Sequence, residues 1–280
     1  MTPSPRQSAI RLVVNADDLG LHPSIDAGIL QAHREGIVTS STVLVTGRSA
    51  VRAIADAKAQ HLPLGVHLCL TTLLPPAADP ASVPSLAPGG RFRARWPQVI
   101  AAWGMGRINL KEVDIEFRAQ IALARKLGAE PDHLDGHQHL HLLPGLAGVV
   151  KAIARDEKLP VRWPIAHPSI AWFGSPGAAL KTAGLAMLSQ VARGQSAGLP
   201  GWGTFEAGAL TEDRLIAIIS RLPPGDHEIG CHPGKTADQV PEQPGWKYGW
   251  EDELQAVRSP RVKSLIQKRG IKLASYGELG

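Results

Sequence analysis

The middle of the chain carries metal-binding residue types at every second position. His133, Asp135, His137, His139 and His141 alternate with other residues in the run His133-Leu-Asp-Gly-His-Gln-His-Leu-His141. Because residues two apart on a β-strand point to the same face, a strand here would bring all five side chains together. Imidazole and carboxylate are the usual protein ligands of divalent transition metals. The run therefore predicts a metal site at the end of a strand; the alternative is a surface strand with one polar face.

Polar side chains also end other apolar runs that read as buried strands. An Asp-Asp pair alone is weak evidence, because most such pairs lie in surface turns, and a lone histidine in a strand is more often a core residue. The repetition of these residues at several strand ends favours one shared site. The candidates are Asp17 and Asp18 after Ile10–Val14, His67 in Leu64–Leu68, and His232 after Glu228–Cys231.

These residue types suit hydrolysis at a metal centre. One carboxylate and two imidazoles, with positions left open for water and substrate, form a catalytic metal site. Such a metal polarises a carbonyl and acidifies water, a second carboxylate can act as base, and a histidine can protonate a leaving amine. Nucleophilic catalysis has less support, because no Gly-x-Ser-x-Gly motif is present and Cys69 and Cys231 are expected to be small buried residues. No phosphate-binding or dinucleotide-binding glycine motif occurs either.

The segments that carry these residues alternate between strand and helix patterns, which predicts a parallel sheet, open or closed into a barrel. In such folds the active site lies at the C-terminal ends of the strands. Two long irregular regions are expected, at 71–97 and 165–203, with a helix near 177–192. Further strands are expected at Thr39–Val45 and Val161–Trp163, and at Ile271–Ala274. Helices are expected at about 23–35, Ala50–Ala59, 113–124, Leu146–Ala154 and Glu212–Arg221, followed by two short helices.

The composition is that of a globular protein, with 280 residues, 44% hydrophobic residues and a net charge of +5. The scattered basic residues exclude a typical nucleic-acid binder. Two cysteines indicate a reducing compartment, and the first eight residues have no apolar signal region, so we expect a cytoplasmic protein without a transmembrane segment. One basic group is expected on the solvated face of a terminal helix, with transient contact to an anionic membrane surface as the alternative. It consists of Arg258, Arg261, Lys263, Lys268, Arg269 and Lys272.

The combined motifs resemble the YdjC-like carbohydrate deacetylases, from about residue 10 to the C-terminus. The order and approximate spacing of the motifs agree with that family. The motifs are Asn15-Ala-Asp-Asp-Leu-Gly20, Gly36-Ile-Val-Thr-Ser40, Gly65-Val-His67-Leu, the run from His133 to His141, and Cys231-His-Pro233. The resemblance implies a single domain over residues 1–280. It also implies a distorted (β/α) barrel of the polysaccharide-deacetylase-like type.

The resemblance also implies roles for individual residues. Asp18, His67 and His137 match the metal ligands, and Asp17 matches the base that activates water. His232 falls where related deacetylases place a histidine acid, and His139 is the reserve for that role. Asp135, His139, His141 and Arg162 are expected to contact the substrate or the metal ligands. Arg162-Trp-Pro164 resembles the Arg-x-Pro element that orients the base.

The function that the resemblance implies is removal of an acetyl group from an N-acetylated sugar with one divalent metal. Mg²⁺ or Zn²⁺ is expected, and Co²⁺, Mn²⁺ or Ni²⁺ also suits the ligand set. The substrate is a chito-oligosaccharide or an N-acetylglucosaminyl lipid such as a hopanoid glycoside, and a homodimer is a further expectation. The alternatives are a metal-dependent amidohydrolase or phosphoesterase, and a sugar-binding protein without catalysis. In amidohydrolases the His-x-His pair usually closes the first strand, whereas Asp17 and Asp18 stand there in this chain.

Overall fold

The computed structural model describes residues 9–163, 165–166, 187–194, 198–203, 206–235 and 248–279. Its strands all pair in parallel, in the order β4-β3-β2-β1-β7-β6-β5, with β8 beside the first half of β1. The strands are β1 (Ile10–Leu19), β2 (Ser40–Val43), β3 (Leu64–Leu68), β4 (Leu134–Gly136), β5 (Ile165–Ala166), β6 (Pro200–Trp202), β7 (Gly225–Cys231) and β8 (Lys272–Leu273).

The sheet curls so that its two ends approach the same short stretch of chain. Val161 forms a parallel bridge with Leu134 of β4, and β5, a few residues further on, pairs with β6. The stretch over residues 161–166 therefore pairs with β4 at one end of the sheet and with β6 at the other. This closes the sheet into a distorted barrel. This confirms the predicted fold class. The predicted strand at Val161–Trp163 is reduced to this one bridge, and the regular pairing begins at β5 instead.

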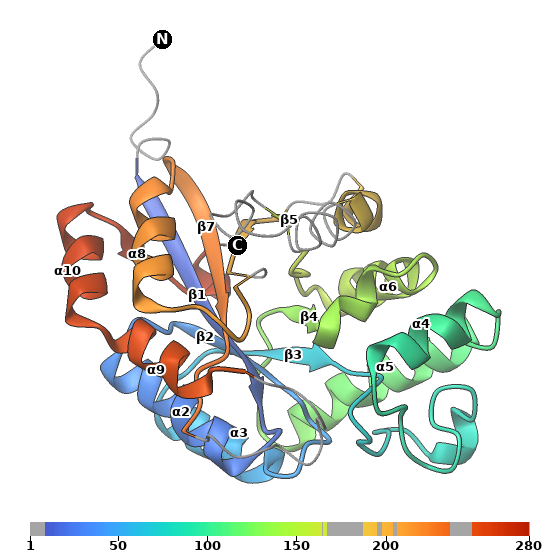
Figure 1. Cartoon of the computed structure of the whole chain (residues 1–280). Helices are drawn as coiled ribbons and strands as arrows, with labels where there is room; N and C mark the ends of the chain where they lie inside the picture. The colour runs from blue at the N-terminus through green and yellow to red at the C-terminus, as the bar shows by residue number, and fades with distance from the viewer. Residues whose placement is uncertain are drawn as a thin grey trace.

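Helices surround the strands on the outside (Figure 1). In that view α2, α3 and α9 lie along the lower left, α8 and α10 at the upper left, and α4, α5 and α6 on the right. The helices are α2 (Pro23–Glu35), α3 (Ala50–Ala59), α4 (Trp96–Gly104), α5 (Leu110–Lys126), α6 (Leu146–Glu157), α8 (Glu212–Arg221), α9 (Trp250–Arg258), α10 (Pro260–Lys268) and α11 (Tyr276–Leu279), with the 3₁₀ helices η1 (Pro80–Ser82) and η2 (His137–Leu142).

Strand β1 is longer than the apolar run that predicted it. Its residues are buried almost throughout, and it continues past the acidic pair to Leu19. The pairing with β2 shifts register between Ala16 and Leu19, and Asp18 has a φ of 73°. Neighbouring strand residues normally point to opposite faces, and an irregularity of this kind re-aims a side chain. The bulge is what allows Asp17 and Asp18 to reach the same cavity.

The prediction of one strand from His133 to His141 is wrong beyond Gly136. Strand β4 ends there, and the chain enters η2, in which Gln138 and His139 have φ values of 55° and 56°. Left-handed backbone at residues other than glycine is uncommon and strained. Of the five polar side chains, only His133 and Asp135 precede the end of β4, and His137, His139 and His141 belong to η2. Alternation in the sequence therefore does not make one face.

Several other expectations are refined by the structure. The 71–97 segment contains only η1 and the start of α4, whereas β5 and β6 both lie inside the second region expected to be irregular. Residues 187–193 are helical, as predicted, and residues 177–186 lie outside the described residues. No described helix has the length and apolar character needed to cross a bilayer.

The C-terminal basic group is not simply a solvated face. Arg258 pairs with Glu35, Arg261 lies 2.6 Å from Glu212, and Lys263 donates to the carbonyl of Glu35. These contacts tie α9 and α10 to α2 and α8, and they match the charges of Arg258 and Arg261 with carboxylates of the protein.

Candidate active site

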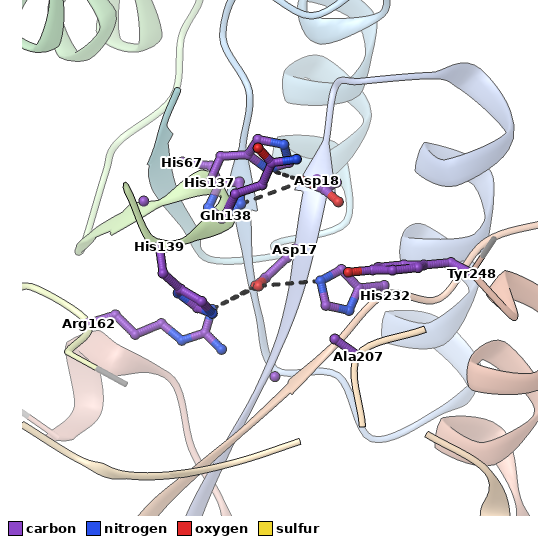
Figure 2. Close-up of a pocket in the computed structure, with 12 residues that line it drawn as sticks. Asp17, Asp18, His67, His137, Gln138, His139, Arg162, Ala207, His232 and Tyr248 are labelled. Carbon is purple, nitrogen blue, oxygen red and sulfur yellow. Dashed lines mark hydrogen bonds and ion pairs between the residues drawn. The ribbon is translucent and has the colours of Figure 1, made fainter. Parts of the chain in front are cut away.

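A cavity of about 140 Å³ lies at the C-terminal ends of the strands. Figure 2 shows its polar side chains converging from β1, β3, η2 and the segment after β7. The cavity wall contains residues predicted from the sequence, and it also contains Gln138 and Tyr248, which the sequence did not single out. The described lining comprises Asp17, Asp18, His67, Gly136, His137, Gln138, His139, Arg162, Ala207, Gly230, His232 and Tyr248.

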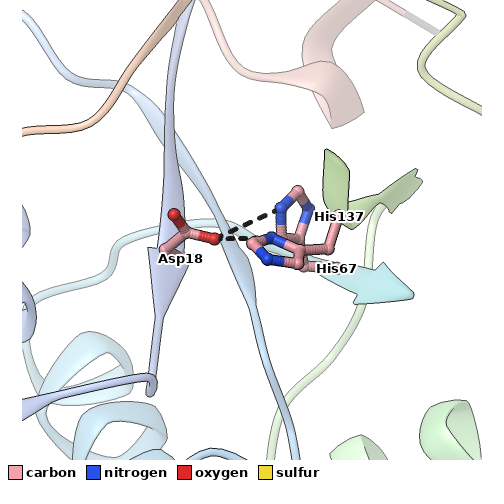
Figure 3. A group of neighbouring side chains, drawn as sticks. All are labelled: Asp18, His67 and His137. Atoms are coloured by element: carbon pink, nitrogen blue, oxygen red, sulfur yellow. Dashed lines mark ion pairs between the residues drawn. The ribbon is translucent and has the colours of Figure 1, made fainter. Parts of the chain in front are cut away.

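Asp18, His67 and His137 form a compact triad in this cavity (Figure 3). Asp18 Oδ1 lies 2.9 Å from His137 Nδ1 and 3.5 Å from His67 Nε2, and the candidate ligand atoms all lie within 4.8 Å of one another. All three side chains are buried. Burial alone would raise the pKa of Asp18, but the neighbouring imidazoles lower it to about 2, so the group is a carboxylate.

The triad fits a divalent cation by its donor set and by its unsatisfied atoms. Both carboxylate oxygens of Asp18 are buried and accept no hydrogen bond of good geometry from the described residues. A buried carboxylate without donors is costly, and carboxylates in that position are commonly paired with a cation. One carboxylate and two imidazoles are a ligand set that leaves positions open.

Asp135 supports the triad from behind. Strands β3 and β4 pair with His67 opposite Asp135, and Asp135 Oδ2 lies 3.1 Å from His67 Nδ1. Burial opposes ionisation, but Arg162 and His67 hold the pKa of Asp135 well below its usual range. A carboxylate on the far nitrogen of an imidazole fixes the ring's orientation and raises its strength as a metal ligand. This leaves Nε2 of His67 directed at Asp18.

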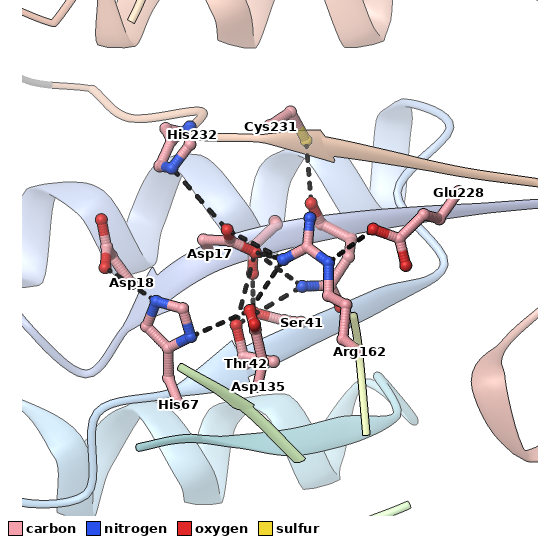
Figure 4. Close-up of polar contacts among 12 residues, drawn as sticks. Asp17, Asp18, Ser41, Thr42, His67, Asp135, Arg162, Glu228, Cys231 and His232 are labelled. Atoms are coloured by element: carbon pink, nitrogen blue, oxygen red, sulfur yellow. Dashed lines mark hydrogen bonds and ion pairs between the residues drawn. The ribbon is translucent and has the colours of Figure 1, made fainter. Parts of the chain in front are cut away.

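Arg162 is the centre of a buried network of carboxylates (Figure 4). Its Nη1 donates to both oxygens of Asp17, at 2.8 and 3.0 Å, and to Asp135 Oδ2 at 2.7 Å. Its Nε donates to Glu228 Oε1 at 2.7 Å. Although burial disfavours the charge, these carboxylates raise the pKa of Arg162 well above its usual value. The predicted contact between Arg162 and Asp17 is thus present in the structure, while Pro164 of the same motif lies outside the described residues.

Glu228, which the sequence did not single out, binds the guanidinium at Nε, and Tyr276 contacts Glu228 in turn. Glu228 is buried in β7, and its second oxygen accepts a hydrogen bond from the hydroxyl of Tyr276. The ring of Tyr276 stacks on His133 with centroids 3.9 Å apart. Gly230 gives the guanidinium room, because a Cβ there would lie 2.3 Å from Arg162 Nη2.

Asp17 receives further hydrogen bonds from its own strand and the next. Asn15 Nδ2 donates to Oδ1 at 2.7 Å, and the hydroxyl of Thr42 on β2 donates to the same oxygen at 3.4 Å. Together with Arg162 these contacts leave the carboxylate with little rotational freedom. Its other oxygen, Oδ2, lies 3.8 Å from Nε2 of His232.

His232 is positioned by Glu253 at the start of α9. The buried carboxylate of Glu253 accepts the His232 backbone N–H at 2.6 Å and lies 3.8 Å from the ring nitrogen Nδ1. The chain after His232 packs closely against α2 at Gly28 and Gly234. The two backbones approach so closely that a Cβ on Gly28 would lie 2.3 Å from the Gly234 Cα. Tyr248 meets the imidazole edge-to-face at 5.0 Å. The ring therefore faces Asp17 across the cavity (Figure 2).

The remaining histidines of the run have separate environments. His141 is buried, and its Nε2 lies 3.2 Å from the carbonyl of Arg162. Burial lowers the pKa of His139 to about 3 and that of His141 to about 4, so both rings are neutral at physiological pH. His133 stands outside the cavity lining, packed against Gly65, where a Cβ would come within 2.4 Å of the ring.

Two other carboxylate and histidine groups are close enough to hold an ion. They are Asp135 with His139 and His141, and Asp17 with His67 and Asp135. Arg162 donates to both Asp17 and Asp135, so each group already contains a cationic partner. A second positive charge at that distance is repelled. The triad of Asp18, His67 and His137 is therefore the best candidate metal site.

Cysteine and tryptophan contribute to packing around the site. Cys69 and Cys231 are buried free thiols, as expected, and burial raises the pKa of Cys69 to about 11. Trp202 and Trp250 are buried, with exposed fractions of 9% and 3%, and neither belongs to the described cavity lining. Trp103 donates to the carbonyl of Pro144. Trp172 and Trp246, which also fall in Gly/Pro-rich segments, lie outside the described residues.

Known proteins resemble this chain over nearly its full length. The sequence profile of the family described as YdjC-like protein matches residues 11–268. A carbohydrate deacetylase of Enterococcus faecalis is 32% identical over 277 residues, covering 96% of this chain and 98% of the relative. A chitooligosaccharide deacetylase of Yersinia pestis is 30% identical, with 95% and 97% covered. A solved structure from Enterococcus faecalis, described provisionally as a cellobiose-phosphate cleavage protein, has a TM-score of 0.78 at 32% identity and covers 98% of this chain and 100% of its own.

Proposed function

Because the chain belongs to the YdjC-like protein family, we propose that it is a carbohydrate N-deacetylase, a hydrolase that removes the acetyl group from an N-acetylated sugar. The observation that carries the proposal is one cavity holding three different chemical groups. It contains the triad of Asp18, His67 and His137, the Arg162-bound carboxylate of Asp17, and the imidazole of His232. Hydrolysis of an amide needs an electrophilic centre, a base and an acid, and these groups supply them.

We assign Asp18, His67 and His137 as the ligands of one divalent metal ion. When bound, this ion would polarise the acetamido carbonyl and make water at the site more acidic. The protein's part is to hold the three ligands in place, and Asp135 does so for His67 through the 3.1 Å contact at Nδ1. Mg²⁺ and Zn²⁺ are the first metals to test, followed by Co²⁺, Mn²⁺ and Ni²⁺.

Asp17 is the proposed base, which takes a proton from the attacking water on one of its carboxylate oxygens. Arg162, Asn15 and Thr42 fix the orientation of that carboxylate, so its free lone pairs have a defined direction. Orientation matters because a base must lie within hydrogen-bond reach of the proton that it removes. The carboxylate is also adjacent in sequence to Asp18, which places base and metal ligand on the same strand.

His232 is the proposed acid, which donates a proton to the departing sugar nitrogen. Its Nε2 faces Asp17 at 3.8 Å, and Glu253 lies on the opposite side of the ring at the same separation. A carboxylate behind an imidazole stabilises the protonated ring and orients it. His139, the reserve candidate, has a pKa that burial lowers to about 3, so it carries no proton to give near neutral pH.

The proposed substrate carries its acetamido group at an accessible end. A cavity of about 140 Å³ is near the size of one that holds benzene, about 150 Å³, so it accepts an acetamido group with part of one sugar ring. A chito-oligosaccharide and an N-acetylglucosaminyl lipid, such as a hopanoid glycoside, both meet this condition. The bulk of either substrate would remain outside the described cavity.

The test is a screen for acetate release with the purified protein. N-Acetylglucosamine, chito-oligosaccharides and an N-acetylglucosaminyl hopanoid are each supplied with one metal at a time. We expect acetate from at least one substrate and none after chelation. The leading alternative is a phosphoesterase or another amidohydrolase, so an aryl phosphate and a simple amide are included. Turnover of those compounds without acetate release from any sugar would refute the proposal.

A further inference from the structure

Residues 187–193 are helical, and their large apolar side chains point outward. Met187 and Val191 are 71% and 66% exposed, and Leu188 is 36% exposed, whereas Ser189 and Ala192 are buried. Positions 187, 188 and 191 fall on one side of a helix with 3.6 residues per turn. A surface helix ordinarily buries its large apolar residues and exposes its small and polar ones. This helix does the reverse, which marks its outer face as an interaction surface.

A cationic groove of about 500 Å³ runs along α6 nearby. Lys151, Arg155 and Lys158 recur at helical spacing, so they share one side of α6 and of the turn that ends it. The described residues that line the groove include these three bases and no carboxylate. The described lining of the groove therefore carries a net positive charge.

The acidic residues of α6 point toward a different neighbour. Asp156 accepts from Arg118 of α5 at 2.7 Å, and Glu157 accepts from Arg125 at 2.6 Å. Arg155 Nε lies 3.8 Å from Asp156, but both side chains are exposed and such a contact contributes little. The charge of the groove is thus available to an external anion.

The C-terminal end of these helical residues lies beside the groove. A Cβ built on Gly194, which follows the helix, would lie 3.5 Å from Lys151 Nζ. In Figure 1 the helix lies directly above α6, on the opposite side of the barrel from α8 and α10. We call the two features together the 151/187 surface, made of Lys151, Arg155, Lys158, Met187, Leu188 and Val191.

We propose that the 151/187 surface docks against an anionic lipid bilayer. The large apolar side chains would enter the boundary between headgroups and acyl chains, while the bases contact lipid phosphates, as in peripheral membrane proteins. A second copy of the chain is a poorer occupant, because a twofold contact places the same surface, and so the same positive charges, against each other. The C-terminal basic group is also a poorer candidate, since Arg258 and Arg261 are paired within the protein. Docking goes beyond the proposed function, because it requires no catalysis.

The experiment is co-sedimentation of the full chain with vesicles of phosphatidylcholine, with and without phosphatidylglycerol. We expect binding to the mixed vesicles only, weakened by salt. Each base near an anionic surface contributes roughly fivefold, so K151Q/R155Q/K158Q should lower the partition coefficient roughly a hundredfold. The matched control is R107Q/K111Q/K126Q, which removes three exposed bases elsewhere and should retain most of the binding.

The apolar half is tested by M187S/V191S, against M105S/V51S, which removes two other exposed apolar side chains. Loss of vesicle binding in the first pair alone supports the proposal. The proposal would be overturned if each control variant lost as much vesicle binding as the variant that it matches. It would also be overturned if the wild-type chain did not bind the vesicles. If M187S/V191S instead changes the mass in sedimentation equilibrium, the surface is a contact between copies. Acetate release from a soluble substrate is measured in parallel on the same variants. Vesicle binding and acetate release then report separately on membrane docking and on the proposed function.

Discussion

Replacing Arg162 by lysine tests how far the site depends on one planar cation. The guanidinium uses Nη1 for Asp17 and Asp135 and Nε for Glu228, and the three carboxylates approach it from different directions. A lysine ammonium group is a compact point charge, and it lacks the several N–H donors that the planar guanidinium directs to different acceptors. Lysine would keep the positive charge but would lose at least one of the three partners.

The size of the effect follows from burial. The side chain of Arg162 is 2% exposed and that of Glu228 is 1% exposed, so a lost contact leaves a carboxylate buried without its partner. Breaking one side of a buried pair costs about 3–5 kcal/mol. For a chain of this size that corresponds to a fall in Tm of about 10 °C. Because Asp17 is also released, we expect kcat/KM to fall on the order of 10²-fold or more.

Thermal unfolding, bound-metal analysis and acetate release measure the three consequences. The matched control is Arg11→Lys, since Arg11 also makes a forked contact, with Asp226, but is 37% exposed. The control should change stability and rate far less. Bound metal should persist in Arg162→Lys, because Arg162 donates to none of the three proposed ligands. Wild-type activity in Arg162→Lys would refute the reasoning that this network orients the base.

The remaining predictions concern the assigned roles. Asp17→Asn should retain bound metal and the fold while activity falls on the order of 10²–10⁴-fold, and near-normal turnover in a kinetic assay would remove Asp17 as the base. His67→Ala and His137→Ala should each lose the ion in elemental analysis, so full occupancy in both would contradict the ligand assignment. His232→Ala should slow amide hydrolysis far more than hydrolysis of an activated acetate ester, whose leaving oxygen departs without a proton. Equal slowing of both substrates would instead indicate that His232 holds the substrate.

The sequence was sufficient to predict which strand ends line the cavity. The β-branched run Ile10–Val14 before Asp17 located β1, and the run Leu64–Leu68, which contains His67, located β3 with its predicted bounds. Such runs are informative because a strand buried on both faces in a parallel sheet excludes polar residues along its length. A polar residue at the C-terminal end of such a strand is therefore unusual enough to indicate a site.

The local backbone at the site could not be predicted in the same way. The bulge at Asp18 and the left-handed pair Gln138 and His139 depend on contacts that form only in the folded chain. Histidines at every second position suggested a strand. The same sequence pattern occurs here in a 3₁₀ turn that contains two left-handed residues, so the pattern does not distinguish the two structures. Strained backbone persists where the surrounding structure holds it, and such places cluster at functional sites.

The residues that support the site were missed because their partners are distant in the sequence. Glu228 and Arg162 are 66 positions apart, and Tyr276 contacts Glu228 from 48 positions further on. One signal was available: Glu228 is a charged residue within a strand otherwise expected to be buried, and such a residue needs a partner. Glu253, at the start of a helix, carried no comparable signal.

The balance of charge inside the barrel has a consequence for folding. Within the described part of the chain, the carboxylates of Asp17, Asp135 and Glu228 surround the guanidinium of Arg162, and the buried carboxylate of Asp18 lies in the same cavity without contacting it. The folded state therefore carries an excess of buried negative charge that the unfolded chain would expose to water. A ligand that binds only the folded state stabilises it by about 2.7 kcal/mol at a hundred times its Kd. Binding of the proposed ion by Asp18, His67 and His137 would link folding to the supply of cation, so thermal stability should then rise with added divalent cation and fall with a chelator. The pool of folded enzyme in a cell would then follow the availability of the ion.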